Sequence, residues 1–107
     1  RLLHILLREG MVGSDAYKAA VERELRTFED ELRVDLVRLS EAAGQPIHAP
    51  ALVATAMTRL VFAMGTTAID LPRERHGEIV EQLVTMLRMI MLGACELANK
   101  DDREATR

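Results

Sequence analysis

Two stretches of the chain are apolar on almost every side. Residues 83–95 contain only Thr85 and Arg88 as polar positions, and residues 51–65 contain Arg59 as their only charge. A helix with one buried face would carry charged residues every three or four positions, so these stretches must be covered on more than one side. A chain of 107 residues is too short to cover both by itself. The pattern therefore predicts a helical domain that buries this surface against a second copy of itself.

Turn and capping residues divide the sequence into about four helices, with no strand-like alternation. Gly10 is suited to end the first helix, Ser14 to cap the second, and Pro50 to occupy the first turn of the third. The expected helices cover residues 1–9, 14–43, 50–69 and about 73–98, followed by a short, charged and mobile tail at 99–107. We therefore expect an all-α fold, an antiparallel bundle of about four helices.

The second and third helices each present a distinct apolar face. The apolar stripe of the second keeps helical spacing for seven turns, through Tyr17, Val21, Leu25, Phe28, Leu32, Leu36, Leu39 and Ala43. Its opposite face, which we expect in water, offers i,i+4 pairs between Glu22 and Arg26 and between Glu29 and Arg33. In the third helix the large side chains of one face are Val53, Met57, Leu60 and Met64, beside a face of small residues.

Composition narrows the class of protein. The net charge is −3 with Lys and Arg scattered along the chain, so no nucleic-acid-binding face is indicated on this piece. Cys95 is the single cysteine, which excludes an intramolecular disulfide and fits a reducing cytoplasm. The longest apolar runs are shorter than the roughly 20 residues that a bilayer requires, so no membrane association is expected. The chain begins inside an apolar pattern and without Met, which suggests a piece of a larger protein.

No catalytic or metal-binding constellation is apparent in the sequence. His4, His48 and His76 lie on different elements, and none has a ligand partner at a recognisable metal spacing. We therefore expect no enzyme activity, no metal and no bound cofactor. Arg59 and Arg88 are each the lone charge of an apolar helix, and an unpaired buried guanidinium is strongly unfavourable. Each is expected to reach a structural partner, which for Arg88 is predicted to be an acid of the facing subunit or of the fourth-helix neighbourhood, such as Glu81 or Glu96.

Four short motifs resemble those of one family. In chain order they are Leu6-Leu7-Arg8-Glu9, residues 14–24 (Ser14-x-Ala-Tyr-Lys-Ala-Ala-Val-x-Arg-Glu24), Val61-Phe62-x-x-Gly65 with Ala68-x-Asp70, and residues 83–94 with Arg88 inside the apolar run. Together they span nearly the whole chain. They resemble the C-terminal domain of the TetR-family repressors of unsaturated fatty acid synthesis (FabR/DesT type).

The resemblance implies a bacterial, cytoplasmic transcription regulator. Such repressors are homodimers whose N-terminal helix-turn-helix domain binds operator DNA, and that domain would lie before Arg1. Residues 1–98 would form the effector-binding and dimerisation domain, in which the last two helices bundle with those of the second subunit. An acyl-CoA-type ligand held in an apolar pocket would tune the affinity for DNA.

Two sets of candidate residues follow. The acyl pocket is expected between the first three helices, lined by Leu3, Leu7, Phe28, Leu32, Met57, Leu60, Val61 and Met64. The dimer interface is expected at or near Phe62, Gly65, Ile69, Thr85, Arg88, Met89, Leu92 and Gly93. Two alternatives stay open, a purely structural dimerisation bundle without a ligand and a helical lipid-binding protein.

Overall fold

The computed structural model describes residues 15–106, which form three α-helices and one 3₁₀ turn, with no strand among them. The helices are α2 (Asp15–Ala43), α3 (Pro50–Ile69) and α4 (His76–Ala105), and the turn η1 covers Arg73–Arg75. The described part of the chain is therefore all-α, as the sequence predicted. The expected first helix, with Gly10 and the Ser14 cap, lies outside the described residues.

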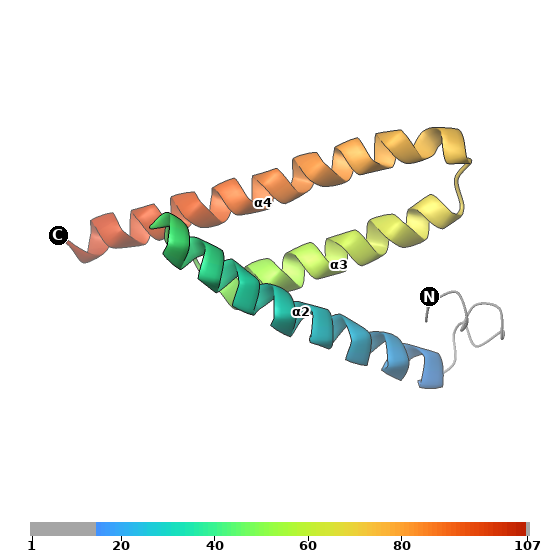
Figure 1. Ribbon diagram of the computed structural model, residues 1–107, viewed down its shortest axis with the longest axis horizontal. Helices are drawn as coiled ribbons and strands as arrows, with labels where there is room; N and C mark the ends of the chain where they lie inside the picture. The colour runs from blue at the N-terminus through green and yellow to red at the C-terminus, as the bar shows by residue number, and fades with distance from the viewer. Residues whose placement is uncertain (1–14, 107) are drawn as a thin grey trace.

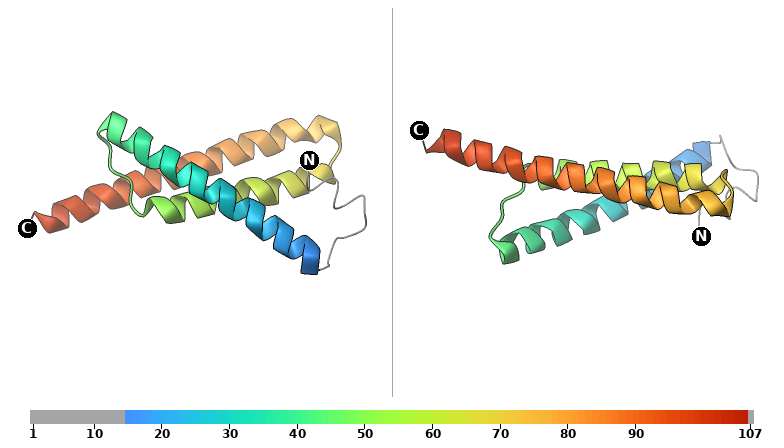
Figure 2. Two further views of the ribbon diagram at one scale, coloured as in Figure 1. Left: turned by 60° about the horizontal axis from the view of Figure 1, so that its bottom comes forward. Right: turned by 90° about the horizontal axis from the view of Figure 1, so that it is seen from above.

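The helices form two layers. α3 and α4 run antiparallel as a hairpin, and α2 crosses one face of that pair obliquely (Figures 1 and 2). α3 packs against both other helices. Residues of all three helices meet in one apolar cluster, made of Leu36, Val53, Ala54, Met57 and Ala94. Ala54 is 1% exposed, because its small side chain lies in this shared cluster.

The turn between α2 and α3 is determined by backbone chemistry. Gly44 follows α2 with φ +65°, a left-handed conformation that glycine adopts readily. The amides of Gly44 and Gln45 donate to the carbonyls of Glu41 and Ser40, which is the Schellman arrangement that ends a helix. Pro50 occupies the first turn of α3, as predicted, and Ala49 before it has φ +45°. The turn therefore reverses the chain and brings α3 under α2.

The structure differs from the sequence prediction at the end of the fourth helix. The chain continues as helix through Ala105, so the expected mobile tail at residues 99–107 is helical over residues 99–105. No Gly or Pro follows Ala98 to stop the helix, and Arg103 in the last turn is favourable beside the carboxyl end of the helix dipole. Asp101 also contacts the α2–α3 turn through His48, at 2.7 Å. These features extend α4 beyond the predicted boundary.

The apolar stripe of α2 is only partly buried. Leu25 and Leu36 are buried, whereas Phe28 and Leu39 are 61% and 66% exposed. Leu25 and Leu36 project from α2 in nearly the same direction, whereas Phe28 and Leu39 lie at one edge of the stripe, so the neighbouring helices cover the first two and leave the last two exposed. The predicted water-facing side of α2 is also partly engaged, as described below. Helical periodicity alone could not give the crossing angle.

α3 is long and apolar enough, by length and composition, to cross a membrane. This is weak evidence for a membrane span, because the core helix of a soluble protein meets the same criterion. Arg59, near the middle of this helix, is paired with acidic residues of α2.

Candidate ligand groove and dimer surface

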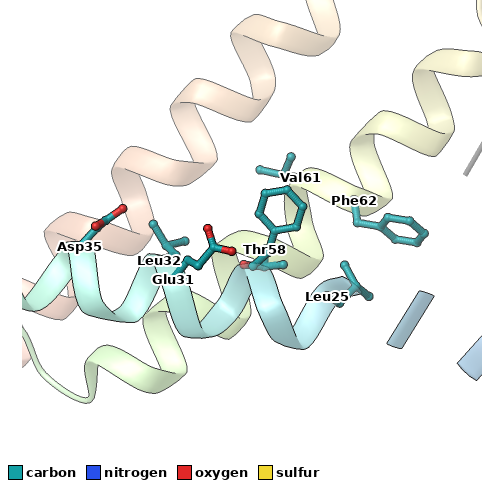
Figure 3. A pocket seen from close by; sticks show the side chains of 8 residues that line it. Leu25, Glu31, Leu32, Asp35, Thr58, Val61 and Phe62 are labelled. Carbon is teal, nitrogen blue, oxygen red and sulfur yellow. The ribbon is translucent and has the colours of Figure 1, made fainter. Parts of the chain in front are cut away.

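A groove lies between α2 and α3. It has a volume of about 400 Å³, which falls within the range of about 300–1,000 Å³ that is common for small-molecule sites. The residues that line it are Leu25, Phe28, Glu31, Leu32, Asp35, Thr58, Val61 and Phe62 (Figure 3). Most of this lining is apolar, so the groove can accept an apolar ligand.

The two ends of the groove differ in polarity. Leu25 and Phe62 lie at one end, and the carboxyl groups of Glu31 and Asp35 lie toward the other (Figure 3). Glu31 and Asp35 are four residues apart on α2 and therefore share a side of that helix. Neither forms an ion pair with another described residue. Among residues 15–106, no Lys or Arg lines the groove. The groove thus has an apolar end and a negatively charged end.

The structure brings together part of the predicted acyl pocket. Phe28, Leu32 and Val61 line the groove. Met57 belongs to the apolar core instead, because its side of α3 packs in the cluster with Ala94 of α4. The remaining predicted residues are Leu60 and Met64, which are half-buried and outside the groove lining, and Leu3 and Leu7, which lie outside the described residues.

Sequence reasoning missed five residues of the groove: Leu25, Glu31, Asp35 and Thr58 were not predicted as site residues, and Phe62 was predicted for the dimer interface instead. Glu31 and Asp35 sit three residues after Phe28 and Leu32, so helical spacing places both carboxylates at the edge of the same face. This spacing is enough to predict from the sequence that Glu31 and Asp35 border the apolar face. Thr58 belongs to the small-residue face of α3. Its place in the groove depends on where α2 crosses α3, and the spacing of residues in the sequence does not predict that point.

An ion-pair network joins α2 to α3 beside the groove. The Arg59 guanidinium donates through Nη1 and Nη2 to the carboxylate of Glu22, at 2.7 and 3.1 Å, and through Nε to Glu29, at 2.9 Å. The Thr55 hydroxyl donates to the other oxygen of Glu29, at 3.1 Å. The prediction that Arg59 reaches a structural partner is confirmed. The expected i,i+4 pairs along α2 are replaced, because Glu22 and Glu29 reach across to Arg59.

The network shifts the pKa values of Glu22 and Arg59. Hydrogen bonding from the Arg59 guanidinium lowers the pKa of the Glu22 carboxyl; desolvation opposes this shift, and the positive charges of Arg59 and Arg26 add to it. The hydrogen bonds to Glu22 and Glu29 raise the pKa of Arg59. Arg59 therefore stays charged, and the network acts as a fixed polar contact between the two helices.

Most of the predicted dimer residues lie on exposed surface. Met89 and Leu92 are each 65% exposed, and Ile69 is 47% exposed. Gly65, Thr85, Arg88 and Gly93 are also exposed. The one member that is not exposed is Phe62, which is half-buried and lines the groove. We call Thr85, Arg88, Met89, Leu92 and Gly93 the outer face of α4.

Arg88 forms no ion pair with another described residue, and Glu96, one of its predicted partners, is instead 3.2 Å from Arg103. In the single chain Arg88 is exposed, so it does not require a partner there. An acid of a second subunit remains the predicted partner.

The histidines of the described part have local contacts. His76 Nε2 lies 2.8 Å from the Ala68 carbonyl oxygen and 3.2 Å from that of Leu71, which ties the α3–α4 turn. His48 pairs with Asp101. Among residues 15–106, no group of three His, Cys, Asp or Glu side chains could hold a metal ion. Cys95 is a free, half-buried thiol.

No protein-family model matches the chain. No solved structure matches it either. The resemblance to the TetR-type repressors therefore rests on the sequence motifs alone.

Proposed function

We propose that this chain is the effector-binding and dimerisation domain of a TetR-type transcriptional repressor of fatty acid metabolism. In this proposal the effector is a long acyl chain carried as a thioester, and operator DNA is bound by a separate helix-turn-helix domain. The domain acts in the bacterial cytoplasm and has no enzymatic role. The proposal is supported by the sequence motifs and by two surfaces of the fold, the groove and the outer face of α4.

The observation that carries the proposal is the apolar surface that the single chain leaves uncovered. Among the described residues only seven side chains are buried, and all are apolar. Exposed large apolar residues are more numerous, and those on α4 include Val80, Val84, Met89, Leu92 and Leu97. Exposed apolar surface of this kind marks an interaction site. A second copy would cover it, with α3 and α4 of both copies forming an antiparallel helical bundle.

A dimer of this kind leaves the groove available. The groove lies between α2 and α3, whereas the outer face of α4 points away from the core cluster, so a partner on that face would meet the groove only at Phe62. Each buried methylene of an acyl chain contributes about 0.8 kcal/mol before ordering costs. A chain that fills the groove also contacts both α2 and α3, so its shape can shift the position of α2. That shift is the signal that would reach the DNA-binding domain.

The first test substitutes Gly93 on the outer face with Arg. A Cβ built at Gly93 meets nothing within 4 Å in the single chain, so the helix itself tolerates a side chain there. Gly93→Arg should therefore split the dimer and keep the helix content, measured by sedimentation velocity and far-UV circular dichroism. Ala19→Arg is the control, because Ala19 is exposed on α2, which lies outside the expected interface. A monomeric parent at micromolar concentration would refute dimerisation.

The second test fills the groove. Val61→Trp should weaken the binding of long-chain acyl-CoA at least about tenfold, because the larger ring occupies space that the acyl chain needs. Ala63→Trp is the control, since Ala63 is exposed and does not line the groove. Binding is measured by isothermal titration calorimetry with the dimeric protein. Equal affinities for parent and Val61→Trp would place the ligand elsewhere.

A second candidate function is a structural dimerisation bundle without a ligand. The two carboxylates in the groove favour it, because a purely apolar lining would suit an acyl chain better. Under this alternative the Gly93→Arg result is unchanged, and no acyl-CoA binds to the parent. The two experiments together separate the candidates.

A further inference from the structure

We infer that Glu31 and Asp35 make the groove selective for the charge of its ligand, so that it accepts an acyl chain with an uncharged head and rejects the free fatty acid. This inference rests on the proposed function, because it assumes that the groove is the effector site. It goes further by naming the residues that distinguish two forms of the same acyl chain.

The polarity of the groove gives the ligand an orientation. Leu25 and Phe62 form the apolar end, which suits the tail of an amphiphile, and the carboxyl groups lie toward the opposite end (Figure 3). The head of the amphiphile is therefore placed beside Glu31 and Asp35. Thr58 is the uncharged polar side chain in the lining, and its hydroxyl can donate a hydrogen bond to a carbonyl oxygen.

The charge of the head then determines its affinity. A free carboxylate would meet two like charges, and none of the described residues that line the groove is a Lys or Arg that could offset them. At about 5–6 Å in water-like surroundings each like charge lowers affinity about threefold, so the pair lowers it about tenfold. An ester or thioester carbonyl carries no charge and avoids this repulsion. In an acyl-CoA the phosphates lie beyond the extended pantetheine arm, away from the acyl carbonyl.

The carboxylates of Glu31 and Asp35 are available to repel a negatively charged head group. Glu22 and Glu29, on the same helix, are engaged by Arg59, whereas Glu31 and Asp35 form no ion pair among the described residues. Both are exposed, so removing their charges does not leave a buried group unsatisfied. Their substitution therefore tests selectivity without unfolding the protein.

The experiment compares three amphiphiles of equal chain length below their critical micelle concentrations, namely laurate, glycerol monolaurate and dodecyltrimethylammonium. Calorimetric titration of the parent should give laurate an affinity about tenfold weaker than that of the uncharged ester, with the cation binding at least as tightly as the ester. In Glu31→Gln/Asp35→Asn the affinities for laurate and the ester should become nearly equal. The matched control is Glu24→Gln/Asp30→Asn, which removes the same charge from exposed positions outside the groove and should keep the difference.

The dependence of the binding affinities on ionic strength provides a second test. Raising the ionic strength from about 0.05 to about 1 M should narrow the difference between laurate and the ester in the parent, because screening acts on exposed charges. Equal binding of all three probes by the parent would overturn the inference and leave the proposed function standing. A preference that survives in Glu31→Gln/Asp35→Asn would also overturn it. If none of the probes and no acyl-CoA binds, the proposed function fails as well.

Discussion

The two neighbours of α3 contact it in different ways. Against α4, α3 packs through apolar side chains, with Val53 and Met57 in the cluster that contains Ala94. Against α2, it uses this cluster at the crossing and then a polar network, in which Arg59 bridges Glu22 and Glu29, beside an open groove. α3 therefore has an apolar contact on the side of α4, and on the side of α2 a contact that includes an ion-pair network and a groove.

This difference indicates which contact is fixed and which can adjust. Apolar packing at native density tolerates little change, because a lost methylene leaves a cavity. An exposed ion-pair network is directional but weaker, and the groove beside it leaves room for a ligand. Because the groove borders α2 and not α4, we expect a ligand to act on the contact between α2 and α3 rather than on the α3–α4 hairpin.

The largest effect on stability is expected from a substitution of Met57, in the apolar contact between α3 and α4. Met57→Ala should lower the free energy of unfolding by about 2–5 kcal/mol, because it leaves a cavity in the core cluster. Leu39→Ala is the control, since Leu39 is 66% exposed and should change stability by about 0.5 kcal/mol or less. Urea denaturation at fixed protein concentration measures both. Equal effects of the two substitutions would mean that the crossing point is not the core.

A smaller effect is expected from Arg59. Arg59→Ala removes the donor that Glu22 and Glu29 share and leaves these two carboxylates of α2 without their counter-charge on α3. The melting temperature should fall, and it should fall less for Arg59→Lys, which keeps the charge but not the planar fork. Arg33→Ala on α2 is the control, because Arg33 is exposed and forms no ion pair with a described residue. An unchanged melting temperature for Arg59→Ala would show that the network does not hold α2.

The smallest effect is a dependence on pH. Because the folded state lowers the pKa of Glu22 below its ordinary value near 4.5, the ionised carboxylate stabilises the fold above that value. This contribution is lost as the pH falls through the lowered pKa. The melting-temperature difference between the parent and Glu22→Gln should therefore shrink between about pH 6 and about pH 3. Glu24→Gln is the control, and a difference that grows on acidification would contradict the assignment.

The sequence by itself determined the elements of this protein. The Pro50 start of α3 and the end of α2 near Gly44 follow from local backbone chemistry, so they could be predicted correctly. The all-α class follows from apolar periodicity in the same way. The need of Arg59 for a partner was also predictable, since a lone guanidinium on an apolar helix requires a counter-charge. The prediction failed at residues 99–105, where a charged composition was interpreted as a mobile tail although nothing in it stops a helix.

Tertiary structure decided where the helices cross. That crossing places Glu22 and Glu29 against Arg59 and forms a groove whose lining includes Glu31 and Asp35. Periodicity gives which residues share a face of one helix. It does not give the angle at which two faces meet, because that angle depends on how side chains distant in the sequence fit together. The candidate site therefore contains three of the predicted residues and acquires its charge from the packing of α2 on α3.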